Sequence, residues 1–184
     1  MLSRRTYTFI SLTVLLISAG WIAFSRVIPG TNVNQNIPVA RPGFLAPDFT
    51  LTTLAGESVR LIDLRGRTVI INLWSSWCPP CRAEMPALQR VSLDYPPDEL
   101  MILAVNLTSQ DSREAAAQFA QENNLTFPIL LDESGVVGAL YQTSALPTTF
   151  FIAADGTIRE MIVGGPISEA LLRAQVDQLT GEVR

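Results

Sequence analysis

The chain has 184 residues, of which 48% are hydrophobic and 16% are charged, and its formal net charge is −4. This length suffices for one domain of ordinary size plus an appendage, and the apolar content excludes a disordered chain. The acidic balance argues against a nucleic-acid-binding protein, and the absence of lysine and histidine excludes Schiff-base catalysis, Cys–His nucleophile pairs and histidine-ligated metal sites.

Residues 1–26 are predicted to be a membrane anchor. Arg4 and Arg5 precede an uncharged run, residues 6–25, which is long enough for one helical span at about 20 residues per crossing. The apolar side chains are spread all round this helix, unlike those of a surface helix. The arginines favour a cytoplasmic N-terminus, so a single-pass protein of the bacterial cell membrane is expected, with its remainder on the extracytoplasmic side. A cleaved signal peptide is the alternative, because residues 18–20 are small enough for a peptidase.

Residues 27–43 are expected to form a linker, because they are rich in proline, glycine and asparagine and show no periodicity. Residues 44–184 are predicted to form one domain. Without Arg4, Arg5 and Arg26, 10 arginines stand against 17 acidic residues, so the exported part carries a net charge of −7.

The domain alternates strand-like and helix-like segments. An Ala55–Gly56 turn predicts an antiparallel hairpin near its start, and Asp155–Gly156 predicts another near its end. Crossovers followed by a hairpin and a helix indicate an α/β domain with a mixed sheet and helices on both faces. The predicted strands are 49–52, 58–61, 68–74, 100–107, 127–131, 148–153 and 157–163, and the predicted helices are 79–95, 111–123, 134–141 and one that begins after Ser168.

Two details of the helices are predicted from single residues. Asp111 and Glu114 have the spacing of a capping box at the start of the helix 111–123. The last helix is expected to place four apolar residues on its inner face, namely Leu171, Leu172, Val176 and Leu179.

Cys78 and Cys81 are the chain's two cysteines, and their Cys-x-x-Cys spacing predicts a redox-active dithiol. They follow the strand 68–74 where a helix begins, so free N–H groups and the helix dipole lower the pKa of a thiolate there. Cys78, at the exposed end of the turn, is the expected nucleophile, and Cys81 is expected to attack the mixed disulfide. Pro79 and Pro80 remove two N–H donors, which predicts a disulfide less oxidising than one with donors at those positions. A structural disulfide would restrain the unfolded chain very little over so short a loop, and a metal site would need more ligands.

Three stretches resemble the TlpA/ResA group of membrane-anchored thioredoxin-like reductases. They are WSSWCPPCRAEMPAL at residues 74–88, APDFTL at 46–51 and LPTTFFI at 146–152, and the resemblance runs in order from Phe44 to the C-terminus. It implies a thioredoxin fold with an added N-terminal β-hairpin and a strand–helix insertion, here residues 127–141. It also implies that Pro147 is a cis proline packed against the disulfide. We expect Trp77, Pro79 and Leu146 to form the substrate rim.

Proton transfer is expected to depend on Glu84. Thioredoxins carry a buried aspartate six residues before the first active-site cysteine, and this chain has Asn72 there, which cannot titrate. Glu84 follows Cys81 by three residues on the same helix face, and helical side chains lean toward the N-terminus, over the thiols. In the group that the chain resembles, a glutamate at this point tunes the thiols. The alternative is an exposed acid in the first turn that only favours the helix dipole.

Together these features predict an extracytoplasmic thiol–disulfide oxidoreductase that reduces disulfides in exported proteins, with the Cys78–Cys81 disulfide as its redox group and no metal or other cofactor. The resemblance implies cytochrome c biogenesis, with the haem-attachment cysteines of an apocytochrome c as substrate and a membrane thiol-transfer protein as electron donor. A thiol peroxidase of the peroxiredoxin type is one alternative, because Ser75-x-x-Cys78 faintly echoes the Thr-x-x-Cys loop of those enzymes. A non-enzymatic binding or scaffold module with an incidental disulfide is the other.

Overall fold

The structure is a computed structural model that describes residues 13–15, 17–18, 21 and 38–181. The chain divides into two compact units, Met1–Asn34 and Gln35–Arg184. Most of the predicted anchor and linker lies outside the described residues, and so does most of the segment on which a signal peptide would depend. Within the described part of the chain, none of the helices combines the length and the apolar character that a membrane crossing requires.

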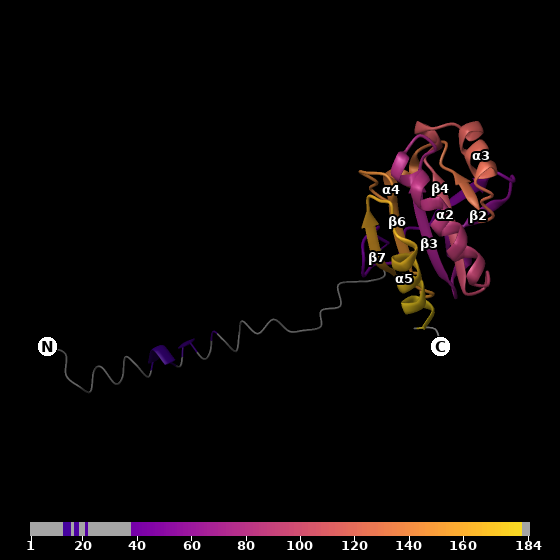
Figure 1. Ribbon diagram of the computed structural model, residues 1–184. Coiled ribbons are helices and arrows are strands. Elements are labelled where there is room, and N and C mark those ends of the chain that lie inside the picture. The colour runs from indigo at the N-terminus through magenta and orange to yellow at the C-terminus, as the bar shows by residue number, and fades with distance from the viewer. Residues whose placement is uncertain (1–12, 16, 19–20, 22–37, 182–184) are drawn as a thin grey trace, which may run out of the picture. The chain divides into compact units, whose positions relative to one another are not determined.

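The second unit contains one seven-stranded sheet and its helices (Figure 1). The strands and helices follow the predicted order, with ends that differ by a few residues. The strands are β1 Thr50–Thr53, β2 Ser58–Arg60, β3 Thr68–Trp74, β4 Leu100–Asn106, β5 Ile129–Leu131, β6 Thr148–Ile152 and β7 Ile158–Val163. The α-helices are α2 Pro79–Asp94, α3 Arg113–Glu122, α4 Val136–Leu140 and α5 Glu169–Gly181, and the 3-10 helices are η1 Leu61–Leu64 and η2 Thr108–Gln110.

The sheet is mixed, as predicted, and its strand order is β2-β1-β5-β4-β3-β6-β7. The central strands β3, β4 and β5 are parallel, because each is joined to the next through a crossover that contains a helix. The strands outside them, β1, β2, β6 and β7, pair antiparallel. The strand β3 therefore lies inside the sheet, between β4 and β6, and α2 starts shortly after its carboxyl end.

The strand β3 is buried along its whole length because both faces of the sheet are covered. Its side chains alternate: Ile70 and Trp74 belong to the apolar cluster beneath α2, α3 and α5, and Ile71 belongs to the cluster beneath η1, α4 and the segment 40–49. Asn72 shares the face of Ile70 and Trp74. The alternation therefore aims one polar side chain at the helix that carries the cysteines.

The antiparallel strand β6 places a second polar residue on the same face. In the register between β3 and β6, Asn72 stands opposite Thr149, and Val69 stands opposite Ile152. The start of β6 thus lies at the disulfide end of β3, and the end of β6 lies at the other end. The Leu146–Pro147 peptide bond directly before β6 is cis, as the resemblance implies.

The expected linker, 27–43, is too long at its C-terminal end. Ala40 is buried in the core, the Val39 amide donates to the Leu45 carbonyl, and the Gly43 amide donates to the Ile158 carbonyl. Leu45 in turn bridges to Thr157, beside the end of β6. Ala40 contributes to the core, so the chain joins the domain at the end of the sheet opposite the disulfide.

Two helix details also differ from prediction. Ser112, and not Asp111, caps α3, because the Ser112 hydroxyl accepts the Ala115 amide. Leu171 is 41% exposed, whereas Leu172 is fully buried. The helix α5 is slightly rotated from the expected orientation, so its inner face is formed by Leu172, Val176 and Leu179.

Candidate active site

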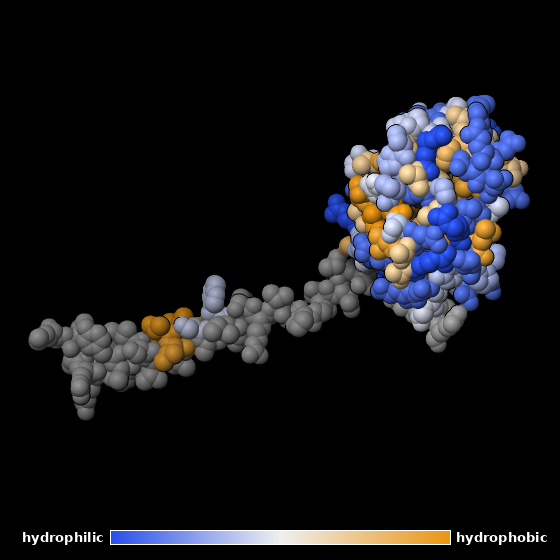
Figure 2. All heavy atoms as spheres, in the orientation of Figure 1, coloured by the Kyte–Doolittle hydropathy of each residue, from blue (hydrophilic) through white to orange (hydrophobic). Residues whose placement is uncertain are grey.

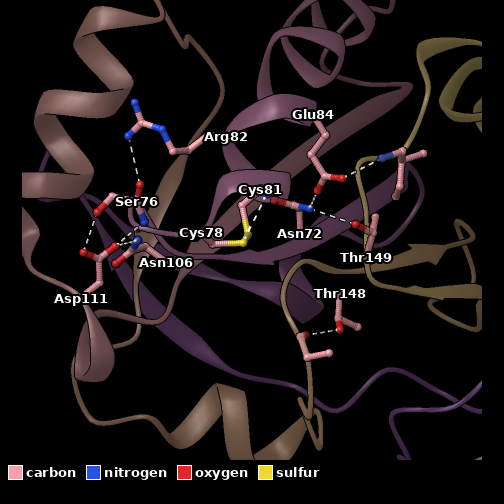
Figure 3. The surroundings of a disulfide bond; sticks show 12 residues. Asn72, Ser76, Cys78, Cys81, Arg82, Glu84, Asn106, Asp111, Thr148 and Thr149 are labelled. Carbon is pink, nitrogen blue, oxygen red and sulfur yellow. Dashed lines mark hydrogen bonds between the residues drawn. A yellow bond between two sulfur atoms is a disulfide. The ribbon is translucent and has the colours of Figure 1, made fainter.

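Cys78 and Cys81 form a disulfide at the start of α2 (Figure 3). Cys78 is the N-cap residue of that helix, and its sulfur accepts the Cys81 amide at 3.3 Å. Pro79 and Pro80 occupy the first helical positions, where a missing N–H breaks no helical hydrogen bond. The Cys81 amide is therefore the first N–H after Cys78 that the helix offers to its sulfur.

Cys78 is less exposed than the sequence suggests. The residue is 3% exposed and Cys81 is 0% exposed, because both pack in the apolar cluster between α2 and the sheet. Cys78 nevertheless lines a groove of about 400 Å³. The groove is formed by Trp77, Cys78, Pro79, Pro80, Leu107, Gln110, Thr143, Ser144, Ala145 and Leu146. The groove is therefore the open space that borders the disulfide.

The groove contains the three residues expected at the substrate rim, Trp77, Pro79 and Leu146. Trp77 is 58% exposed, but its indole N–H donates to the Gln110 carbonyl at 2.9 Å, which fixes the ring at the rim. None of the described residues that line the groove is charged. Further along the surface, Figure 2 shows hydrophobic residues gathered over the side of the domain that carries β6, β7 and α5.

Glu84 is buried, with 1% of its surface exposed, so it is not the exposed helix-end acid of the alternative interpretation. Its Oε1 accepts the Asn72 side-chain amide at 2.7 Å, and its Oε2 accepts the Ile167 backbone amide at 2.9 Å. Burial raises the pKa of the Glu84 carboxyl, and the two hydrogen bonds offset only part of that rise. A carboxyl that is easily protonated therefore lies one helical turn beyond Cys81.

Pro147 and Glu84 meet at Gly165. A Cβ atom at Gly165 would lie 2.6 Å from Glu84 Oε2 and 2.6 Å from Pro147 Cγ, so only glycine fits there. The Pro147 carbonyl accepts the Gly164 amide at 2.7 Å, which holds the segment after β7 against the residue before β6. Leu146 packs on the same apolar cluster as both cysteines.

Asp111 belongs to the site, although its spacing to Glu114 predicts only a helix cap. Its carboxylate accepts the Ser76 amide at 2.6 Å, the Ser76 hydroxyl at 2.7 Å and the Asn106 side-chain amide at 2.8 Å (Figure 3). It also accepts the Ser112 amide at 2.9 Å. Burial raises the pKa of Asp111, but these hydrogen bonds outweigh it and hold the pKa below its ordinary value. Asp111 thus ties the loop before Cys78 to the ends of β4 and α3.

Several of these partners carry no signal in the sequence. Thr149 is 77 residues from Asn72, and Gly165 stands in a Gly-Gly-Pro stretch that predicts a loop but no partner for it. For Asp111, the short-range spacing to Glu114 predicts a helix cap. This spacing gives no indication of the hydrogen bond between Asp111 and Ser76. In the described residues, no group of three or more cysteine, aspartate or glutamate side chains is arranged to hold a metal ion.

Comparisons with known proteins agree with this geometry. The AhpC/TSA family model matches residues 42–161. The chain is 43% identical over 123 residues to the thioredoxin-like protein YneN of Bacillus subtilis, which covers 66% of this chain and 71% of YneN. It is 37% identical over 166 residues to the thiol-disulfide oxidoreductase ResA of Oceanobacillus iheyensis, covering 88% of this chain and 83% of ResA. The crystal structure of StoA from Bacillus subtilis superimposes with a TM-score of 0.62 at 32% identity, covering 70% of this chain and 96% of StoA.

The contacts of Asp111 predict an acid-sensitive contribution to stability. Asp111→Asn is expected to lower the free energy of unfolding at pH 7 by about 1–3 kcal/mol, because an amide replaces a carboxylate that accepts four hydrogen bonds. A lowered pKa stabilises the fold above the ordinary value of 3.8, and this stabilisation is lost as the pH falls through the still lower pKa of the folded state. Urea unfolding at pH 7 and at about pH 2 therefore should show the gap between wild type and variant narrowing in acid.

The control is Glu133→Gln, at an exposed carboxyl in a 3.8 Å ion pair with Arg113. It should change the unfolding free energy by less than about 0.5 kcal/mol at either pH. An Asp111→Asn gap that is the same size at both pH values would show that the charge of Asp111 does not stabilise the loop.

Proposed function

The chain belongs to the AhpC/TSA family of thioredoxin-like proteins and is a thiol-disulfide oxidoreductase related to ResA, and from this membership we propose that it reduces disulfides in exported proteins. The observation that carries the direction of the reaction is the Pro79–Pro80 pair inside the disulfide ring. In the part of the chain that the structure describes, the Cys81 amide donates to the Cys78 sulfur, and Pro79 and Pro80 have no N–H to add. A Cys78 thiolate with few donors is a weak leaving group and a strong nucleophile, which suits a reductant.

The reaction begins with the reduced Cys78–Cys81 pair. The Cys78 thiolate attacks one sulfur of the substrate disulfide, the substrate S–S bond breaks, and the other substrate sulfur leaves as a thiolate. The Cys81 thiolate then attacks Cys78 Sγ, the mixed disulfide breaks, and the second substrate sulfur leaves. Two electrons have passed to the substrate, and the protein holds the Cys78–Cys81 disulfide shown in Figure 3.

Glu84 supports the second attack. Cys81 is fully buried and has to lose its proton before its sulfur can attack. The Glu84 carboxylate is the acceptor for that proton, because it lies on the same face of α2 and burial raises its pKa toward that of a thiol. The carboxyl then returns the proton when the disulfide is next reduced.

The groove favours substrates that present an uncharged peptide around the disulfide. Its walls combine apolar side chains with the neutral polar groups of Gln110, Thr143 and Ser144, so recognition depends on shape and hydrogen bonds. The haem-attachment cysteines of an apocytochrome c are the substrate that we propose. A membrane thiol-transfer protein would supply the electrons, and no cofactor besides the disulfide is required.

We place the catalytic domain on the extracytoplasmic side of a bacterial cell membrane. The support is the uncharged apolar run at residues 6–25 with Arg4 and Arg5 before it, which has the length and the charge pattern of a retained anchor. The redox chemistry agrees with this location, because disulfides form and persist in exported proteins.

The reduction potential tests the direction. We expect a value near that of thioredoxin, about −270 mV, and well below that of the oxidant DsbA, about −120 mV. Equilibration of the full-length protein with glutathione buffers measures it. A potential above about −180 mV would contradict the reductase assignment.

Two further measurements test the alternative functions. Rapid consumption of hydrogen peroxide by the reduced protein would favour the thiol peroxidase. Full function of a variant with both Cys78→Ser and Cys81→Ser would favour the scaffold module.

The charge of Glu84 predicts a shift in thiol chemistry. Glu84→Gln keeps the size of the side chain and removes a negative charge near the thiols, so the pKa of Cys78 should fall and the disulfide should become more oxidising. Each pKa unit corresponds to about 1.36 kcal/mol. Thiolate absorbance and alkylation rate against pH measure the change. Asp94→Asn, at an exposed acid near the other end of α2, is the control and should leave the curve in place. If the pH curves of Glu84→Gln and wild type superimpose, Glu84 does not affect the thiols, and proton transfer to and from them must proceed through water.

Fractionation tests the anchor. If residues 6–25 are retained as a membrane span, the protein should stay in the membrane fraction through washes with high salt and carbonate, because burial of the apolar span outweighs anything that those washes remove. Mass spectrometry of the purified protein identifies its N-terminus. A mature N-terminus at Trp21 would establish cleavage and rule out the tethered form.

A further inference from the structure

The side chain of Asn72 has an unusual hydrogen-bond arrangement. Asn72 is fully buried, and its Nδ2 donates to Glu84 Oε1 at 2.7 Å and to Thr149 Oγ1 at 2.9 Å. Its Oδ1 is buried and has no partner among the described residues. A buried amide oxygen without a partner is costly, so this one calls for a physical explanation.

The arrangement fits an ionised Glu84 but not a protonated one. An ionised carboxyl accepts hydrogen bonds only, which suits the donors at Asn72 and Ile167. A protonated carboxyl has one O–H that needs an acceptor. The Ile167 backbone amide only donates, so Oε2 remains an acceptor and the proton belongs on Oε1, which faces Asn72.

A half-turn of the Asn72 carboxamide removes this mismatch at Glu84 and moves Nδ2 to the buried position that Oδ1 occupied without a partner. It places Oδ1 where Nδ2 stood, and a separation of 2.7 Å suits an O–H···O bond as well as an N–H···O bond. The Thr149 hydroxyl accommodates both orientations, because a hydroxyl accepts from Nδ2 in one and donates to Oδ1 in the other. The Glu84–Asn72–Thr149 chain is therefore bonded end to end in either protonation state.

We propose that Asn72 is a positioning residue that turns its carboxamide over as Glu84 gains and loses its proton, with Thr149 as the switchable partner on its far side. The carboxyl then stays in one place while it exchanges a proton with Cys81. This inference rests on the proposed role of Glu84. It explains why asparagine and a buried glutamate occur together here, since an ionised aspartate at position 72 would repel an ionised Glu84 at 2.7 Å.

The neighbouring elements add no competing charge. The strands β3, β4 and β6 and the segment 164–168 contain no charged residue. On α2, Arg82 donates to the Ser76 carbonyl and Arg90 pairs with Glu169 of α5. Asp94 of α2 pairs with Arg173 of α5. Among the described residues, the pKa of Glu84 therefore responds to burial and to the hydrogen bonds from Ile167 and Asn72. In the oxidised protein neither Cys78 nor Cys81 titrates.

Nuclear magnetic resonance of the oxidised, full-length protein in detergent tests the proposal directly. The probes are the ¹³C signal of the Glu84 carboxyl and the ¹H–¹⁵N signals of the Asn72 carboxamide. We expect both to shift with the same midpoint as the pH rises, because one proton controls both groups. In Glu84→Gln the Asn72 signals should not respond to pH. An Asn72 signal that stays constant while Glu84 titrates would overturn the proposal.

Two matched variants separate this role from simple packing. Thr149→Val removes the switchable hydroxyl and should shift the common midpoint, whereas Thr148→Val, at a hydroxyl bonded to the Ala145 carbonyl, should not. Asn72→Leu cannot form a hydrogen bond with either the ionised or the protonated Glu84 carboxyl. It should slow disulfide reduction at neutral pH by about tenfold, as expected for one lost hydrogen bond. Equal midpoints in both threonine variants would also contradict the proposal.

These outcomes are independent of the direction of electron flow. A reduction potential typical of an oxidant would refute the proposed reductase function and leave the oxidised-state titration intact. A constant Asn72 signal would refute the carboxamide turn and leave the measured potential intact. If Asn72→Leu does not fold, the wild-type titration decides alone.

Discussion

Glu84 is a carboxyl group buried between α2 and the sheet, and its two hydrogen bonds join three distant parts of the chain. Asn72 comes from the middle of β3, Glu84 from the first turns of α2, and Ile167 from the loop before α5. Burial of an unpaired carboxylate is expensive, so these partners have to be present whenever the group is ionised. The packing of α2 and α5 on the sheet, the close approach at Gly165 and the cis Pro147 all surround this one group.

A second set of contacts holds the disulfide from the opposite side. Asp111 binds both the amide and the hydroxyl of Ser76, and the Gln110 carbonyl binds the Trp77 indole. The segment after β4 therefore holds the two residues that precede Cys78. With Glu84 beyond Cys81 and Asp111 before Cys78, hydrogen bonds hold the chain on both sides of the disulfide, which is the kind of preorganisation that favours catalysis.

Short-range patterns were enough to predict much of the fold. The apolar run at β3, the Asp155–Gly156 turn and the cysteine spacing each depend on neighbouring residues, and each appears as predicted. Contacts that depend on the tertiary structure were not accessible. The Asn72–Thr149 bond needs the register of β3 with β6, and the burial of Cys78 needs the apolar cluster beneath α2. The spacing of Asp111 and Glu114 predicts that Asp111 caps α3. In the fold Ser112 caps this helix, and Asp111 accepts a hydrogen bond from the Ser76 amide.

The docking of residues 38–43 decides which end of the domain is free. The chain enters the folded unit beside Thr157 and the end of β6, whereas the disulfide lies beyond the carboxyl end of β3. The seven residues of β3 separate these ends by about 23 Å, at about 3.3 Å per residue. A domain held by its N-terminal segment would therefore carry its disulfide on the pole remote from the point of attachment. If the anchor proposed above is retained, a partner in solution would meet that pole directly, whereas an electron donor embedded in the membrane would have to reach past the body of the domain.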